Sequence, residues 1–345
     1  MRRSSHCRLP SGRWMKRSHR TNGPANCNNV PRILVTGGAG FIGSHLVERL
    51  IAEGYCSVTV LDNLQRGRVA NLAAVEESVR FVQGDIRNRR TLATVMKDTN
   101  LVFHLAAQSN VIGAHQDVDY ASSTNVVGTA TVLEAARAAG VGRLVFTSSR
   151  EVYGDPAELP VSETVSLRPK NAYGMSKVAG EMCCTMFAKP AFETVILRLA
   201  NAYGPRDYGR VIPLFIENAL SGRPLVLYGG KQILDFVHID HVVDALMKAG
   251  FDKHVACPVN VGSGKGTTIA ELAERILTIL HSGSEIRWMP SRDMEVAQFV
   301  ADTTNARKLL GLEHQDDSLH RLRELIAWAA QKSQPPRKVM TGVPV

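Results

Sequence analysis

A glycine-rich turn between a short apolar run and a helical pattern constrains this chain more than any other feature. The run Ile33–Thr36 is followed by Gly37, Gly40 and Gly43, spaced three residues apart. Residues 44–51 then continue with helical periodicity. Glycines in such a turn let the backbone approach a pyrophosphate, and the helix N-terminus stabilises its negative charge. A turn that needs glycine only for steric reasons is the alternative, but the strand-turn-helix context favours a dinucleotide site.

A carboxylate follows the second apolar run, residues 57–61. Asp62 stands at the end of that run, where it would accept hydrogen bonds from the adenosine ribose and repel the additional phosphate of NADP. We therefore predict NAD as the cofactor. Arg66 and Arg68 lie close by in the sequence and weaken this preference without reversing it.

Strand-like and helical segments alternate along the first two thirds of the chain. This order predicts an α/β fold with a Rossmann-type doubly wound parallel sheet. The expected strands include 79–82, 101–105 and 144–147, and the expected helices 124–138 and 177–187.

Beyond Asn201 the chain is richer in Gly and Pro, and helices are expected near 269–280 and 319–329. This part predicts a smaller C-terminal substrate-binding lobe. The predicted organisation is a basic disordered tail (1–30), an NAD-binding domain (31–200), a substrate lobe interleaved with it (201–330) and a flexible tail (331–345).

The formal net charge of +9 is concentrated in one segment. Residues 1–30 carry seven Lys or Arg and no acid, which leaves 34 basic and 32 acidic residues elsewhere. A solvated extension is the favoured reading of this arm, and a nucleic-acid or acidic-surface arm and a transit peptide are the alternatives. The nearly neutral body disfavours nucleic acid as a partner. The absence of a long apolar run predicts no membrane span and a cytoplasmic protein, and the absence of a CxxC pair predicts no metal site.

Tyr173 and Lys177 form a candidate catalytic pair, because their i, i+4 spacing places them on one face of a helix. An ammonium beside a phenol, together with a positively charged nicotinamide, would favour the phenolate, which could take the proton of a hydroxyl group. The pair is common by chance, but its place after a dinucleotide-binding half favours catalysis.

Taken together, these motifs resemble the extended short-chain dehydrogenase/reductase family, in its NAD-dependent nucleotide-sugar epimerase, dehydratase and decarboxylase branch. The resemblance covers residues 31–329. It rests on the ordered motifs at 37–43, 61–63, 84–86, 104–108, 125–129, 148–149, 173–177 and 201–206.

The resemblance implies further site residues and a nucleotide-sugar substrate, most simply a UDP-sugar. It also implies a homodimer formed through two helices of each subunit. Ser149 would bind the reacting sugar oxygen, although a strand-end hydroxyl that satisfies the backbone is the alternative. Phe41, Ile42, Asn63, Asp85, Ile86, Leu105, Ala106, Ala107, Gln108 and Asn125 would hold or support the cofactor, and Asn201, Arg206, Tyr228 and Arg292 would hold the nucleotide diphosphate and base.

The chain departs from the family pattern at the substrate end. Leu234 stands where the family commonly has an Arg before Asp-Phe, so one diphosphate-binding cation is missing. Arg206, Arg210 or Arg292 would have to compensate. Met294 and Glu295 replace the usual Gly and Asp of a second segment.

The reaction that the resemblance favours is 4-epimerisation of a UDP-hexose through a transient 4-keto sugar. A UDP-glucuronate decarboxylase and a nucleotide-sugar 4,6-dehydratase share its first half-reaction and are the alternatives. A non-catalytic NAD-sensing binding protein is an alternative of a different class.

Arg150 and Glu151 bear on the choice among these reactions. The dehydratases of the family carry Thr-Asp-Glu where this chain has Ser149-Arg150-Glu151, and a guanidinium is a poor substitute for the acid. One hypothesis is that Arg150 borders the sugar and favours a polar or anionic C6 group, while Glu151 is not required for hydride transfer. The structural alternatives are an ion pair between Arg150 and Glu151, or a Glu151 that points to solvent.

Overall fold

The computed structural model describes residues 30–333 apart from 253, 254 and 256. The predicted N-terminal arm (1–30) and C-terminal tail (331–345) therefore lie almost entirely outside the described residues. No helix in the described part of the chain is long and apolar enough to span a membrane.

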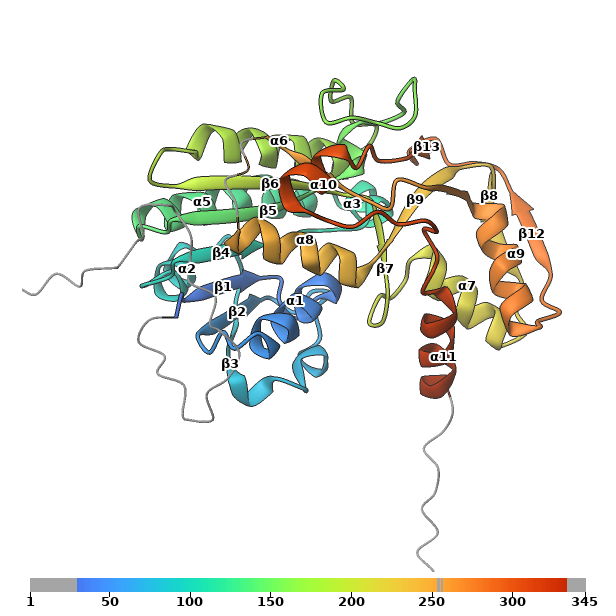
Figure 1. The fold of residues 1–345 in the computed structure, drawn as a ribbon, viewed down its shortest axis with the longest axis horizontal. Coiled ribbons are helices and arrows are strands. Elements are labelled where there is room, and N and C mark those ends of the chain that lie inside the picture. Colours follow the sequence, from blue (N-terminus) through green and yellow to red (C-terminus); the bar gives the residue numbers. More distant parts are fainter. Residues whose placement is uncertain (1–29, 253–254, 256, 334–345) are drawn as a thin grey trace, which may run out of the picture.

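The centre of the molecule is a seven-stranded parallel sheet, which confirms the predicted fold class (Figure 1). Its strand order is β10-β6-β5-β4-β1-β2-β3, so the order reverses between β1 and β4. At such a point the loops after two strands diverge and leave room for a ligand. The strands are β1 Ile33–Thr36, β2 Val58–Asp62, β3 Val79–Gln83, β4 Leu101–His104, β5 Arg143–Ser149, β6 Glu193–Leu199 and β10 Val259–Val261.

Helices cover both faces of this sheet. α1 (Phe41–Ala52) and α8 (Ile239–Phe251) pack on one face, and α2 (Arg89–Val95), α5 (Thr129–Ala138) and α6 (Ala172–Phe187) on the other (Figure 1). The strands are apolar on both sides because both faces are buried.

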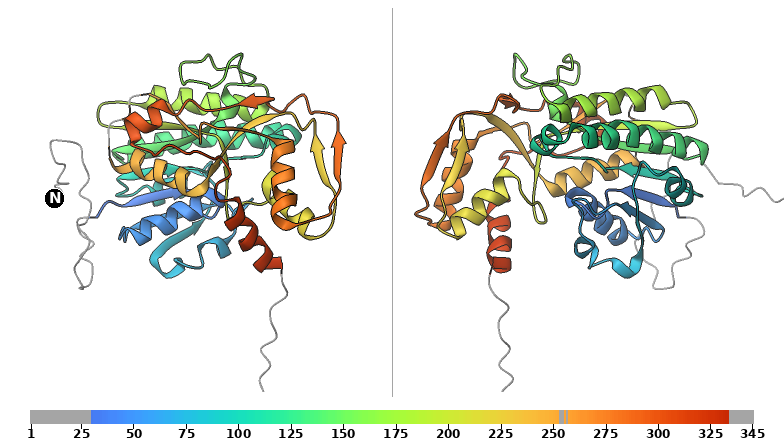
Figure 2. Two further views of the ribbon diagram at one scale, coloured as in Figure 1. Left: turned by 45° about the vertical axis from the view of Figure 1, so that its right-hand side comes forward. Right: turned by 180° about the vertical axis from the view of Figure 1, so that it is seen from behind.

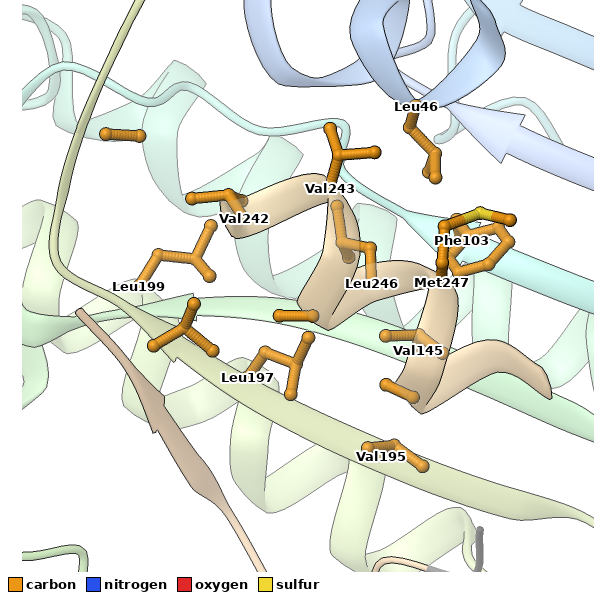
Figure 3. Packing of buried hydrophobic residues seen from close by; sticks show 14 of the residues in the cluster. Leu46, Phe103, Val145, Val195, Leu197, Leu199, Val242, Val243, Leu246 and Met247 are labelled. Carbon is orange, nitrogen blue, oxygen red and sulfur yellow. The ribbon is translucent and has the colours of Figure 1, made fainter. Parts of the chain in front are cut away.

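Alternate residues of each strand point to opposite faces, as the pleat requires. Val145 and Leu197 lie under α8, beside Val242 and Leu246 (Figure 3), whereas Phe146 packs with the helices of the other face.

The substrate lobe has its own core and stands at one end of the large sheet in both views of Figure 2. It contains a four-stranded sheet, a two-stranded sheet and three helices. These are β7 Asn201–Tyr203, β9 Ile233–His238, β11 Gly266–Thr268 and β13 Gln298–Phe299; β8 Leu225–Tyr228 and β12 Ile286–Met289; and α7 Val211–Leu220, α9 Ile269–Leu280 and α11 Leu322–Ser333.

The two lobes are interleaved in the sequence, and shorter elements complete the fold. α8 and β10 lie beyond residue 200 in the sequence but pack with the first sheet, so the chain passes between the lobes more than once. The short elements are η2 Val69–Leu72, η3 Glu76–Ser78, α3 Val111–Gln116, α4 Val118–Ser122, the π-helical η4 Ser123–Gly128, η5 Arg150–Val152 and α10 Thr304–Leu310.

Candidate active site

A pocket of about 1030 Å³ lies between the carboxyl ends of the sheet strands and the substrate lobe. It is lined by every residue that the sequence nominated for the site except Asp85 and Asn125. Seven Lys or Arg and four Asp or Glu line it, so its net charge favours anionic ligands.

The glycine-rich turn begins directly after β1 and lies against the loop that follows β4. Gly37 has a φ of +72°, and a Cβ there would stand 2.7 Å from the backbone nitrogen of Ala106. A Cβ on Gly43, inside α1, would stand 2.2 Å from the Gly37 carbonyl oxygen. Both positions therefore require glycine, and the turn keeps its backbone exposed toward the pocket as a pyrophosphate site demands.

Asp62 stands at the end of β2 beside this turn, as predicted. Its carboxylate accepts hydrogen bonds from the backbone nitrogens of Ala39 (3.0 Å) and Leu64 (2.8 Å). Burial raises the pKa of this carboxyl, while these two hydrogen bonds oppose the change. Of the two nearby cations, Arg66 donates a hydrogen bond to the Ser109 hydroxyl, and Arg68 lies over the Tyr208 ring.

Asp85, which the resemblance placed beside the adenine, is not among the residues that line the pocket. It forms an ion pair with Arg87 (2.7 Å) and accepts a hydrogen bond from Asn63. The hydrogen bond from Arg87 lowers the pKa of Asp85 to about 2. Ile86, the next residue, does line the pocket and packs against Gly128.

Asn125 lies behind the pocket and connects two of its walls. Its side chain accepts a hydrogen bond from the backbone nitrogen of Gln108 (2.8 Å) and donates to the hydroxyl of Ser176 on α6 (2.9 Å). Asn125 belongs to the π-helical segment η4, a distortion that often marks functional sites. It fixes the loop after β4 relative to the helix of the Tyr-Lys pair.

Tyr173 and Lys177 lie in the first turns of α6, and both are buried in the pocket wall. The Lys177 Nζ donates to the Thr147 carbonyl oxygen (2.8 Å) and lies 5.8 Å from the Tyr173 ring centroid. Burial lowers the pKa of Lys177 to about 8.

The pKa of Tyr173 differs from the expectation that a neighbouring ammonium lowers it. Burial is the largest effect on this group, and it raises the pKa of Tyr173. Arg210 and a hydrogen bond with Ser149 act in the opposite direction. The Ser149 hydroxyl also accepts a hydrogen bond from the backbone nitrogen of Glu151. Ser149 therefore satisfies a backbone donor at the end of its strand and also lies beside Tyr173.

Arg150 and Glu151 form the ion pair that was one of the structural alternatives left open by the sequence. An Arg150 Nη2 to Glu151 Oε1 distance of 2.8 Å joins two buried side chains. The other Glu151 oxygen accepts from Asn171 (2.7 Å), the N-cap residue of α6, and the Arg150 Nε donates to Asn201 (2.8 Å). Both charged residues line the pocket.

Arg206 borders the pocket, but its guanidinium is not directed to a diphosphate as the resemblance implied. Its two terminal nitrogens donate to the Glu48 carboxylate of α1 (2.7 and 2.6 Å), and one also donates to the Asn71 carbonyl oxygen (2.8 Å). In this structure Arg206 joins the substrate lobe to the helix after the glycine turn, an arrangement that disfavours the diphosphate role expected for it.

At the far end of the pocket, Arg292 lies over the Tyr228 ring, with 3.5 Å between the guanidinium carbon and the ring centroid. Arg292 also pairs with Glu295 (3.2 Å), one of the residues that depart from the family pattern. Leu234 lines the same pocket, so the missing Arg leaves an apolar wall there.

The chain is similar to known proteins over most of its length. Residues 33–262 match the family model described as "NAD dependent epimerase/dehydratase family". The chain belongs to this family.

Three relatives within the family carry names for three different reactions. A UDP-glucose 4-epimerase of Mycolicibacterium smegmatis is 37% identical over 313 residues, which cover 88% of this chain and 100% of that protein. UDP-glucuronic acid decarboxylase 1 of Xenopus tropicalis is 33% identical over 82% of this chain and 68% of that protein. The dTDP-glucose 4,6-dehydratase DesIV of Streptomyces venezuelae, solved with NAD bound, superposes with a TM-score of 0.81 at 33% identity, covering 87% of this chain and 97% of that one.

Family membership makes the chain an NAD-dependent enzyme of the nucleotide-sugar epimerase, dehydratase and decarboxylase group. The pocket fits NAD because Gly37 and Gly43 leave no side chain between the backbone and a pyrophosphate. When bound, NAD supplies a two-electron hydride acceptor. The buried phenol of Tyr173, beside the Ser149 hydroxyl, is an arrangement that can take a proton from a sugar hydroxyl.

Sequence reasoning missed two groups in this family site. Asp207 is buried and lies near Arg66 and Arg210, with 3.6 Å between its Oδ1 and the Arg210 Nε. Burial raises the pKa of Asp207 to about 6. Asn171, which holds Glu151, could have been found, since an Asn at the start of a helical pattern is a typical N-cap.

Proposed function

We propose that the chain is a UDP-hexose 4-epimerase that acts through a transient 4-keto sugar. Tyr173 takes the proton of the C4 hydroxyl, Ser149 hydrogen-bonds the same oxygen, and Lys177 holds its charge close to the phenol. The 4-keto sugar then turns within the pocket and is reduced on its other face. No proton needs to be removed at C5 and no group departs, so a second acid or base is not required.

The observation that carries this proposal is the engagement of Glu151. Its two carboxylate oxygens are held by Arg150 (2.8 Å) and by Asn171 (2.7 Å). Both carboxylate oxygens therefore already have partners within the protein, and a Glu151 that took a proton from the sugar would have to give up one of these contacts. Arg150 cannot serve as an acid at neutral pH. Dehydration and decarboxylation, which need a second acid or base near C5, are therefore disfavoured.

UDP-glucuronate decarboxylation is the second candidate, because Glu151 is retained in the pocket and the Xenopus tropicalis relative carries that name. Glu151→Gln separates the two, with products followed by mass and NMR. Under the epimerase proposal the variant keeps most C4 inversion of UDP-glucose, since Gln preserves the shape and the Asn171 contact. Loss of carbon dioxide from UDP-glucuronate in the wild type, abolished in the variant, would favour the decarboxylase.

We further propose that Arg292 and Tyr228 bind the nucleotide and that Arg210 replaces the diphosphate cation absent at Leu234. Arg292 and Arg210 are half-exposed in the pocket, whereas the Arg206 guanidinium is bound to Glu48. Arg210→Ala and Arg292→Ala should each raise KM for UDP-glucose at least tenfold. An unchanged KM in either variant would remove that residue from the substrate site.

We also propose that the enzyme is a homodimer formed through α6. Met175, Met182 and Met186 are 63%, 68% and 65% exposed, and their spacing places them on one side of the helix. The catalytic pair lies on the buried side. An exposed methionine stripe of this kind is suited to a helix of a second copy. Light scattering should give twice the monomer mass, and Met182→Glu should reduce it to one monomer; a monomeric wild type would contradict the proposal.

A further inference from the structure

One buried donor in the pocket has no partner. Arg150 is 9% exposed. Its Nε donates to Asn201 and its Nη2 is ion-paired with Glu151, but its Nη1 has no hydrogen-bond partner within the described residues. A buried charged donor without an acceptor is costly, so native proteins seldom leave one unpaired unless a ligand or water completes it.

The position of Arg150 restricts which ligand group can complete it. This step rests on the proposed function, in which Ser149 and Tyr173 act on the C4 oxygen of the sugar. Arg150 directly follows Ser149 and lines the same pocket. The Nη1 is buried, so only a substituent of the substrate that can reorient toward it can serve as its acceptor. The oxygen on C6 can do so because it turns about the C5–C6 bond, whereas the C3 oxygen is fixed to the ring.

We propose that the Arg150 Nη1 donates to the C6 oxygen of the substrate and thereby selects hexoses over pentoses, which lack C6. The same contacts select a hydroxymethyl group over a carboxylate. The charge of Arg150 is already balanced by Glu151 at 2.8 Å, and a uronate would place a second anion beside that carboxylate. The sequence analysis expected Arg150 to favour either a polar or an anionic group at C6. The ion pair with Glu151 favours the neutral polar group.

Arg150→Lys tests this inference. Lysine keeps the positive charge next to Glu151 but lacks the planar guanidinium that carries Nη1. The measured quantity is the ratio of kcat/KM for C4 inversion of UDP-glucose to that of UDP-xylose. We expect this ratio to fall about tenfold, which is the loss of one charge-assisted hydrogen bond to the hexose alone. The double variant Arg150→Gln with Glu151→Gln, which removes both charges, should give the same fall.

Arg143→Lys is the matched control. Arg143 is also buried and ion-paired, to Glu193 at 2.6 Å, but it does not line the pocket. Its substitution should leave the substrate ratio at the wild-type value.

The outcomes distinguish this inference from the proposed function. If both substrates lose activity equally in Arg150→Lys, Arg150 is a positioning residue only and the inference is wrong. It is also wrong if the wild type inverts UDP-glucuronate more efficiently than UDP-glucose. If the wild type inverts neither UDP-glucose nor UDP-xylose, the proposed function fails, and the inference fails with it.

Discussion

The guanidinium of Arg150 lies 2.8 Å from the carboxylate of Glu151, inside the pocket that also contains Tyr173. The two residues are neighbours in the sequence, and Asn171 holds the remaining Glu151 oxygen at the start of α6. In the proposed 4-epimerase reaction the proton is taken by Tyr173, and the ion-paired Glu151 is not needed as a second base near C5.

Tyr173→Phe should retain the fold and bound NAD but lose C4 inversion by roughly 10²- to 10⁴-fold, because only the proton acceptor is removed. NAD content after denaturation and steady-state turnover with UDP-glucose measure the two effects. Turnover close to the wild type would show that another group takes the proton.

Asp207→Asn should stabilise the ligand-free protein at neutral pH. The folded pKa of Asp207 is raised from 3.8 to about 6, chiefly by burial. The cost of charging it in the folded state is absent below pH 3.8, grows between pH 3.8 and 6, and is fully present above pH 6.

The variant should therefore gain roughly 1 to 3 kcal/mol in free energy of unfolding above pH 6. That gain should disappear near pH 4. Urea denaturation of wild type and variant between pH 4 and pH 8 measures the difference. A gain that does not depend on pH would show that the pKa of Asp207 is not raised.

Arg206→Ala should lower stability more than it affects substrate binding. The variant removes the contacts with Glu48 and the Asn71 carbonyl, which join the substrate lobe to α1. We expect a loss of about 1 to 3 kcal/mol and a change in KM for UDP-glucose of less than threefold. Glu48→Ala should have a similar effect, and the double variant should add little. A rise in KM of tenfold or more, with an unchanged free energy of unfolding, would show that Arg206 binds the nucleotide diphosphate after all.

Local patterns in the sequence were sufficient to predict much of the fold. The turn after β1 was predictable because Gly37 and Gly43 are sterically required there, and α9 begins and ends at the predicted residues. Its N-terminus has a capping box formed by Thr268 and Glu271, which is a purely local signal.

Long-range contacts account for what sequence reasoning did not find. Arg206 matches a family position, but its partner Glu48 is 158 residues away in the sequence, and no local pattern indicates that contact. The raised pKa of Asp207 arises from burial between the lobes. Likewise, the effect of burial on Tyr173 exceeds the charge effects that its spacing from Lys177 suggested.

The most direct test of the account is the product formed from UDP-glucose by the purified protein with NAD. Mass spectrometry and proton NMR identify that product. We predict an unchanged mass and inversion at C4 to UDP-galactose, with no net accumulation of reduced cofactor. A product that has lost water from UDP-glucose, or loss of carbon dioxide from UDP-glucuronate with no inversion of UDP-glucose, would contradict the assignment as a 4-epimerase.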